Sequence, residues 1–357
     1  MATTGGRNIT NASGQSNSTG KDVSNREDLA NFITMITRDE TPFLASIGKT
    51  KSTNIYHEWQ TDELQAPGNS RVAEGTDFLA AGTAPAAGDG ADSTIVGPMR
   101  TRLGNYTQIN SKTISVSGSR RALDQAGVAD EYAYQLKKRG TEMRRDMEFD
   151  VVNTYNKQTS TGARKTGGYQ AFINSNDTCV FKGAFTQPAT PNTGVTTVTV
   201  AAGAAKAALA LTDIDAVMQK IYEAGGKATR VMVSPKLRRD FSDLLISDTG
   251  VQRNIDDSGK LRQSVDVYMS DFGDLMVVPN YIMGLASTTT DATTTQFNAK
   301  DSCALVYDPM WFAMATFRPM QEVEVGQKGD STVGMFVEEW SLEVKNPKGC
   351  GAIYGLT

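Results

Sequence analysis

The sequence contains a single histidine, His57, and this scarcity narrows the reactions that the chain could catalyse. A Ser-His-Asp or Cys-His site would have to use that one imidazole, together with a carboxylate that orients it. The neighbouring carboxylate, Glu58, is unsuitable because adjacent residues of a strand point to opposite faces. We therefore expect His57 to have a structural or interface role.

Cysteine is scarce as well: Cys179, Cys303 and Cys350 are odd in number and far apart. Zinc sites need clustered Cys and His ligands, so no such site is expected. The spacing instead predicts reduced thiols in a chain made in a cytosol. Residues 256–259 resemble part of a calcium loop, but the later glutamate ligand is missing and a solvated turn is the preferred interpretation.

The signals for a phosphate-binding loop are incomplete. Gly48, Lys49 and Thr50 match the end of such a loop, but Phe43 stands where its first glycine is required. No G-x-G-x-x-G pattern follows a predicted strand. These absences predict that the chain is not an enzyme and has no catalytic, cofactor-binding or metal-binding residues.

Long apolar runs and an excess of basic residues are also missing. No run approaches the ~18 apolar residues of a membrane span, and the polar residues 1–21 lack the apolar region of a signal peptide. The net charge is −4, whereas duplex binding needs clustered Lys and Arg. We therefore expect no membrane partner and no main function in DNA binding, while weak contact with nucleic acid through one face stays open.

The most informative feature that is present is a long polar hairpin pattern. An extended run over residues 53–60 precedes a segment rich in Gly and Ala from 68 to about 92, and a second extended run follows from Tyr106 to Val116. Each arm of such a hairpin could reach ~40 Å. Its tip has little apolar material to bury, so it gains stability only against another molecule. The pattern therefore favours a protein that assembles with copies of itself.

The longest helical pattern runs from Asp130 to about Lys157 and would span ~40 Å. Its apolar residues recur in steps of three and four, which predicts a narrow buried stripe. The rest of its surface carries six cations and six anions, a mixture that suits salt bridges better than a nucleic-acid stripe. We expect this helix to brace a sheet.

The remaining patterns predict a polar arm over residues 1–24, a short amphipathic helix over 25–36, and a mixed middle segment followed by strands. Thr212 and Asp215 have the spacing of a capping box. The predicted middle elements are strands 196–200, 230–233, 265–269 and 275–278, a helix over 211–224 and a helix from Pro235. The predicted C-terminal strands are 302–307, 311–317, 321–325 and 336–344.

Several passages occur in an order that resembles a known family. They are TPFLASIGK (41–49), YHEWQTD (56–62), RLGNYTQI (102–109), QLKKRG (135–140) with RDME (145–148), EAGG (223–226), VDVYMSDFG (265–273) and DPMW (308–311). Together they resemble the major capsid proteins of tailed bacteriophages with the Hong Kong 97-type fold, particularly a subgroup without a maturation protease.

The resemblance implies an α+β fold that is divided into four parts. Residues 1–49 would form an N-terminal arm with a short helix, and residues 50–110 an extended β-hairpin loop. Residues 111–165 and 301–357 would form a peripheral domain, with a spine helix over 130–157 and the C-terminal strands. Residues 166–300 would form an axial domain.

Two departures from the family pattern limit what the resemblance implies. Some members crosslink a lysine of the extended loop to a neighbour, but no lysine lies between Lys51 and Lys112, so this mechanism is not expected. Some members carry a long cleaved scaffolding region, whereas this arm has about 25 residues. Any scaffold is therefore expected to be a separate protein.

The predicted function is that of a structural subunit of the virion. It would assemble in the host cytoplasm into hexamers and pentamers of an icosahedral shell around double-stranded DNA. Decoration, scaffolding and portal proteins are possible partners, and contact with packaged DNA would be weak and non-specific. The alternative of the same fold is an encapsulin-like compartment with enzyme cargo. A soluble hydrolase or binding domain, and a threonine-rich fibre or adhesin, are rivals from other classes.

Overall fold

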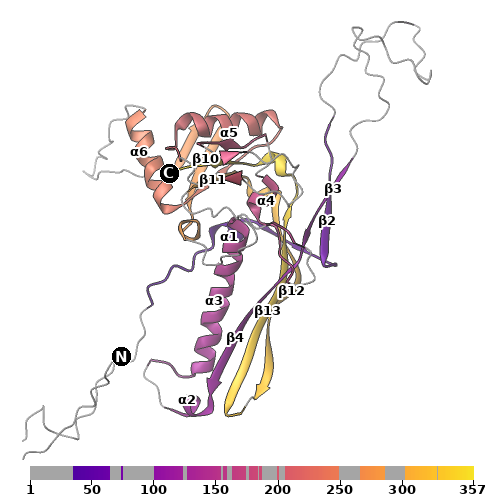
Figure 1. Ribbon diagram of the computed structural model, residues 1–357, viewed down its shortest axis with the longest axis vertical. Coiled ribbons are helices and arrows are strands. Elements are labelled where there is room, and N and C mark those ends of the chain that lie inside the picture. The colour runs from indigo at the N-terminus through magenta and orange to yellow at the C-terminus, as the bar shows by residue number, and fades with distance from the viewer. Residues whose placement is uncertain are drawn as a thin grey trace, which may run out of the picture.

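The computed structural model describes residues 35–64, 74, 100–123, 127–153, 156–158, 163–173, 177–183, 185–186, 199–200, 206–248, 266–285, 302–327 and 329–357. Two sheets dominate these residues: a long four-stranded sheet along the lower part of the molecule, and a six-stranded sheet in the upper part (Figure 1). The predicted arm, most of the predicted helix 25–36, the tip of the predicted hairpin and the calcium-like residues 256–259 lie outside the described residues.

The long sheet has the strand order β1-β12-β13-β4. Strand β1 pairs in parallel with β12, and the other neighbours are antiparallel. Register shifts in β12 flank Pro319, which lacks a backbone N–H, so the two strands predicted over 311–317 and 321–325 form one strand with an irregular middle. The strands are β1 (Gly48–Lys51), β4 (Gln108–Ser117), β12 (Phe312–Gln327) and β13 (Ser331–Val344).

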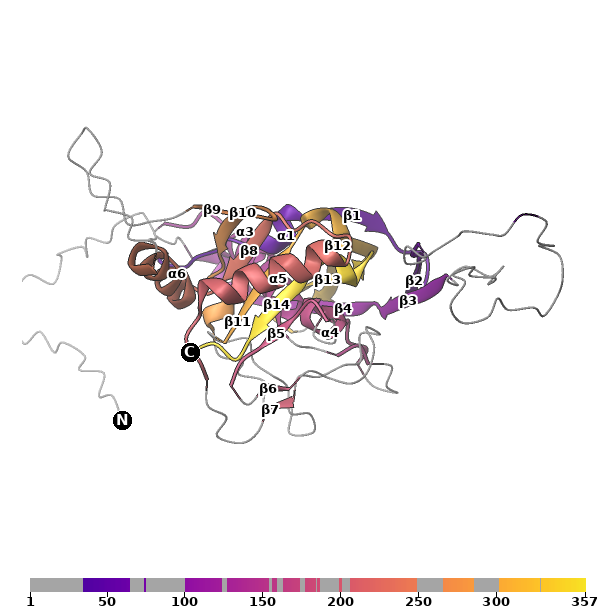
Figure 2. The same cartoon turned by 90° about the horizontal axis from the view of Figure 1, so that it is seen from above.

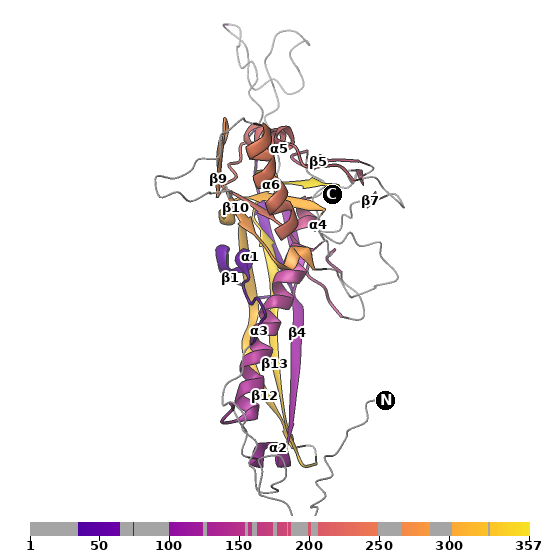
Figure 3. The same ribbon diagram turned by 90° about the vertical axis from the view of Figure 1, so that its left-hand side faces the viewer.

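Helix α3 (Glu131–Val152) lies along the long sheet, as Figures 1 and 3 show. Met143, Met147 and Val151 of the predicted stripe are buried there, which confirms the brace. The predicted end at Lys157 is wrong. Asn153 leaves the helical conformation, and its side-chain amide donates to the Phe149 carbonyl at 2.9 Å, so one of the last carbonyls of the helix is satisfied.

The hairpin contains less of the second extended run than the sequence pattern suggests. Strand β2 (Tyr56–Thr61) pairs with β3 (Thr101–Tyr106), and this two-stranded stem extends away from the body (Figure 1). Strand β4 instead pairs with β13 along its length. The second extended run of the prediction is therefore divided at Thr107, because Ile114 and Val116 are buried in the long sheet.

The six-stranded sheet has the order β5-β14-β11-β8-β10-β9. Strands β11 (Cys303–Tyr307) and β14 (Gly351–Tyr354) belong to it and not to the long sheet. Both are buried throughout, as expected for apolar strands covered on two faces. The other strands are β5 (Val180–Phe181), β8 (Arg230–Val233), β9 (Val267–Ser270) and β10 (Gly273–Pro279).

Helices α5 (Leu211–Glu223) and α6 (Pro235–Asp248) pack against this sheet (Figure 2). The helix begins at Leu211 as predicted, but the predicted capping box is wrong: the N-cap is Ala210, two residues before Thr212, and Asp213 accepts the Ala210 N–H at 2.8 Å. Asp215 instead accepts the hydroxyl of Tyr268. The shorter elements are α1 (Pro42–Ser46), α2 (Gly118–Ala122), α4 (Tyr169–Ile173), β6 (Phe185–Thr186) with β7 (Thr199–Val200), and three 3-10 turns, η1 (Ile282–Gly284), η2 (Pro309–Trp311) and η3 (Pro347–Gly349).

The core has two parts, one on each face of the six-stranded sheet. Alternate residues of β11 face opposite ways, so Leu305 joins one apolar cluster and Val306 the other. The first cluster connects the two sheets through aromatic rings: Phe43 of α1 lies 5.1 Å from Tyr307 and 5.4 Å from Phe312. No helix in the described part of the chain combines the length and apolar character that a membrane crossing requires.

Two glycines, Gly140 within α3 and Gly168 beside its C-terminal end, lead to opposite predictions. A Cβ on Gly168 would lie 2.5 Å from the carbonyl oxygen of Asn153, so Gly168→Ala is expected to lower the free energy of unfolding by about 1–3 kcal/mol. A Cβ on Gly140 would meet only a Phe336 ring carbon at 3.9 Å, so Gly140→Ala is expected to raise it by about 0.5–1 kcal/mol. Urea unfolding of dissociated subunits measures both, and changes of the same sign would contradict the prediction.

Candidate functional site

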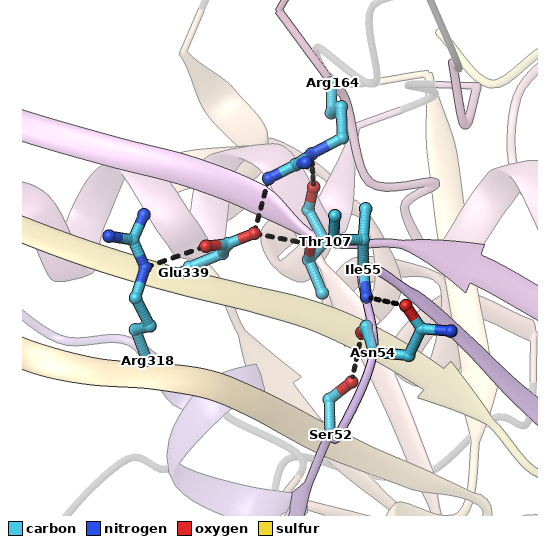
Figure 4. Close-up of polar contacts among 7 residues, drawn as sticks. All are labelled: Ser52, Asn54, Ile55, Thr107, Arg164, Arg318 and Glu339. Atoms are coloured by element: carbon cyan, nitrogen blue, oxygen red, sulfur yellow. Dashed lines mark hydrogen bonds and ion pairs between the residues drawn. The ribbon is translucent and has the colours of Figure 1, made fainter.

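A hydrogen-bonded junction joins the β2–β3 hairpin to the long sheet (Figure 4). On the outgoing side, the Ser52 N–H donates to the Thr316 carbonyl at 3.0 Å, directly after β1 ends. The Ser52 hydroxyl then donates to the Asn54 carbonyl at 2.7 Å, and the Asn54 side chain accepts the Ile55 N–H at 2.7 Å. These local bonds form the turn that leads from the sheet into the hairpin.

Glu339 of β13 is the centre of the junction and is only 2 % exposed. Its Oε1 accepts the Thr107 hydroxyl at 2.7 Å and Arg164 Nη2 at 2.5 Å, and its Oε2 accepts Arg318 Nε at 2.8 Å. Figure 4 shows the carboxylate between the two guanidinium groups. Two cations and a hydroxyl therefore compensate for burial of this charge.

Thr107 connects the hairpin to that carboxylate. It lies between β3 and β4, so it marks the point at which the returning strand enters the sheet. Its N–H donates to the Ile55 carbonyl at 2.8 Å, which closes the base of the hairpin. Its carbonyl accepts Arg164 Nε at 3.2 Å. Both strands of the hairpin are thus held at one buried point.

Asn105 of β3 fixes the next part of the stem and is fully buried. Its amide nitrogen donates to the Gly167 carbonyl at 3.0 Å and the Leu342 carbonyl at 2.8 Å. Its side-chain oxygen accepts the Gly167 N–H at 2.8 Å. Because a buried amide is costly unless satisfied, these bonds specify one position for β3 against the body.

Lys157 supports the opposite side of the stem. Its Nζ donates to the Gly104 carbonyl at 2.7 Å and to the Tyr56 hydroxyl at 3.3 Å, and it lies 5.5 Å from the centre of the Tyr56 ring. Burial lowers the pKa of Lys157, and the charge of Glu58 raises it in part. Gly104 leaves room for the ring, since a Cβ there would lie 2.6 Å from a Tyr56 carbon.

We expect Lys157→Met to loosen the stem while the apolar part of the side chain stays packed. Loss of the bond to Gly104 should cost about 1 kcal/mol, so amide exchange in β2 and β3 should become faster. Hydrogen exchange by mass spectrometry measures this, with Lys138→Met, an exposed position of α3, as the control. Equal exchange in the two variants would contradict a role for Lys157.

His57 lies on the stem with contacts that suit its predicted structural role. Its Nε2 is 3.4 Å from Glu343 Oε2, and its ring centre is 5.8 Å from that of Trp59. Glu58 faces the other way, with Arg102 at 3.8 Å. The carboxylate that approaches His57 comes from β13 and was not anticipated.

The other sequence candidates do not gather into a site. Gly48 and Lys49 lie in β1, paired with β12, so the phosphate-loop interpretation is excluded. Cys179, Cys303 and Cys350 are buried thiols that form no disulfide with one another. Within the described residues, no group of three or more His, Cys, Asp or Glu side chains is placed to hold a metal ion.

The residues of the junction were not identified from the sequence. Arg164 and Glu339 are separated by 175 positions, and no spacing rule relates them. The one available signal was the polar series Glu339, Ser341 and Glu343, two of them acidic, on a strand whose alternate residues are apolar. A buried acidic face would require cations from elsewhere, which the sequence alone could not assign.

The arrangement holds a projecting hairpin at a defined angle. A two-stranded hairpin is marginally stable by itself, so the junction supplies its support at the base. Leu64, three residues beyond the end of β2, has a side chain that is 99 % exposed. The junction therefore fixes the hairpin as a projection from the body.

Comparisons with known proteins agree with this geometry. The family model for the SU10 major capsid protein matches residues 8–357. The major capsid protein of Escherichia phage Phieco32 is 28 % identical over 260 residues, which cover 65 % of this chain and 70 % of that protein.

Solved structures of phage capsids have the same fold. The structure from Mycobacterium phage Adephagia has a TM-score of 0.58 at 9 % identity, with 95 % of this chain and 98 % of that chain covered. The mature capsid of bacteriophage PhiM1 has a TM-score of 0.54 at 12 % identity, with 95 % and 94 % covered. The predicted α+β fold of the Hong Kong 97 type is confirmed.

Proposed function

Because this chain belongs to the SU10 major capsid protein family, we propose that it assembles as hexamers and pentamers into a closed icosahedral shell around double-stranded DNA. Its role as a phage major capsid protein, predicted from the sequence, is confirmed. The encapsulin-like alternative is not favoured, since the family model and the curated relative are both phage capsid proteins.

The observation that supports the assembly mechanism is the hairpin stem on its buried junction. The stem leaves the body at a fixed angle, and its end carries exposed Leu64. We assign the hairpin to lateral contact with a neighbouring copy, where strand and loop would bury surface that one chain exposes. The division into arm, loop, peripheral and axial parts remains part of this proposal, with β11 and β14 moved to the axial sheet.

The other partners follow from the same role. Scaffolding, decoration and portal proteins would bind the shell, and DNA would be touched weakly and without sequence preference. Assembly would take place in the host cytoplasm before the chain becomes part of the virion. A capsid family is a family of structural proteins, and the absence of any enzymatic activity remains a prediction.

Expression of the full chain followed by electron microscopy tests the proposal. Closed shells with five-fold and six-fold clusters, and neighbouring hairpins laid across adjacent copies, are expected. Because no lysine lies between Lys51 and Lys112, denaturing gels should show monomers and no covalent ladder. A chain that stays monomeric in light scattering at high concentration, with and without a co-expressed scaffold, would overturn the proposal.

A further inference from the structure

A cavity of about 450 Å³ lies where α1, α3 and β12 meet, apart from the buried carboxylate of the junction. Apolar side chains such as Leu44, Ile47, Met147, Met314 and Met320 form about half of its walls, and polar groups form the rest. Its volume is typical of protein pockets that bind a ligand. Thr41, the residue before α1, is one of its lining residues, so the chain enters α1 at the cavity.

The cavity also contains three charged side chains. Glu338 of β13 is 5 % exposed, and its Oε2 is buried without a hydrogen-bond partner in the part of the chain that the structure describes. Lys49 and Arg144 line the same space, and their charges lower the pKa of Glu338 against the larger effect of burial, which raises it. A buried acceptor of this kind is costly until a donor reaches it.

The residues just before the cavity expose apolar side chains. Met35 is 61 % exposed and Ile36 is completely exposed, although they lie only a few residues from Thr41. They end the segment 25–36, whose Leu29, Phe32, Ile33 and Ile36 recur at helical spacing. Arg26, Glu27 and Asp28 give that segment one net negative charge, against one net positive charge for the cavity.

We propose that this cavity is a socket for residues 25–36 of a second copy of the chain. The apolar stripe of the segment would fill the walls, its acidic residues would approach Lys49 and Arg144, and an N–H donor would reach Glu338. The inference rests on the proposed function, since the two copies must be neighbours in a shell.

A second copy fits the socket better than the chain's own segment. Entry of Ile36 into its own cavity would require the chain to reverse within residues 37–40, which contain no Gly or Pro. The described trace before α1 instead leads away from the body (Figure 1). If the segment instead enters the cavity of a second copy, the described path before α1 stays unchanged, and Met35 and Ile36 become covered.

Disulfide trapping in mixed shells tests the proposal. Subunits with Ile36→Cys are co-assembled with subunits that carry Ala45→Cys, a position that lines the cavity. Oxidation should give disulfide-linked dimers in mixed shells and not in shells of either variant alone. The native cysteines are buried, which keeps the background low. Ile36→Cys mixed with Ser115→Cys, exposed on β4, is the control and should give at least tenfold less dimer.

Other outcomes separate this inference from the proposed function. An intramolecular disulfide in the double variant, without dimers in mixed shells, would overturn exchange between copies. Normal shells without any disulfide would overturn the socket and leave the proposed function intact. Wild-type chain that forms no shells would count against the proposed function itself.

A binding measurement keeps the socket testable if the cysteine variants do not assemble. A labelled peptide of residues 25–36 should bind dissociated full-length subunits, and Arg144→Glu should weaken binding about tenfold. Lys137→Glu, which reverses an exposed charge on the same helix away from the cavity, should leave binding unchanged. A peptide that does not bind the wild-type chain, or that binds both variants equally, would overturn the proposal.

Discussion

Replacement of Glu339 by alanine is expected to prevent shell assembly and to lower the free energy of unfolding by about 3–5 kcal/mol. The change removes the carboxylate that accepts from Thr107, Arg164 and Arg318. Arg164 is three-quarters buried and would keep a charge without its partner, whereas Arg318 is more exposed and can recover water. The hairpin would lose its fixed angle because Thr107 loses the contact that positions it.

Two companion variants make the Glu339 result interpretable. Glu339→Gln keeps an acceptor for Thr107 but loses the charge, so it should be destabilised less than alanine and assemble poorly. Glu58→Ala removes an exposed acid of the stem, 3.8 Å from Arg102, and should cost at most about 0.5 kcal/mol. Denaturant unfolding of dissociated subunits and electron microscopy provide the measurements. A Glu339→Ala chain that assembles normally would refute the junction's role.

Regular elements were predictable where one physical pattern determined them. The stripe Ile214, Val217, Met218 and Ile221 repeats at helical spacing, and α5 buries these side chains. The turn after it was also predictable, because Gly225 has φ +82 and only glycine adopts that conformation easily. In β13, alternation between Trp340, Leu342 and polar residues indicated the strand.

The short elements could not be predicted, because residues that are distant in the sequence stabilise them. Helix α1 has five residues with Pro42 at its start, and its first N–H groups are satisfied by Glu148 about 105 positions away. Strand β14 contains Gly351 and is held between β5 and β11. The junction is a further example, because the fold brings Arg164 and Arg318 to Glu339 from other parts of the chain. Sequence spacing carries no information about such contacts.

Glu148 of α3 leads to the second large prediction, because it joins three parts of the chain. It is fully buried. Its Oε1 accepts the Phe43 N–H at 2.9 Å and the Asn280 amide at 2.7 Å, and its Oε2 accepts the Leu44 N–H at 2.8 Å. Burial raises the pKa of Glu148 from 4.5 to about 7, against these three bonds, which lower it.

The raised pKa of Glu148 makes stability depend on pH in a defined direction. Between pH 4.5 and about 7 the folded chain keeps a proton on Glu148 that the unfolded chain has released. The free energy of unfolding should therefore fall as the pH rises through this window, by about 3 kcal/mol from this group. Burial also raises the pKa of Asp150 to about 7, so the two carboxyl groups act in the same direction.

Glu148→Gln should remove part of this pH dependence. The variant cannot titrate, and its amide nitrogen would face N–H donors, so it should be about 1–3 kcal/mol less stable than wild type at pH 5. Urea unfolding at pH 5 and pH 7.5 should then show a smaller difference than in wild type. Asp150→Asn should remove a second part, and the double variant should keep only a smaller difference, to which Glu338 contributes because burial raises its pKa as well. If Glu148→Gln retains the full wild-type difference, then Glu148 is not the group that links α1, α3 and Asn280 to pH.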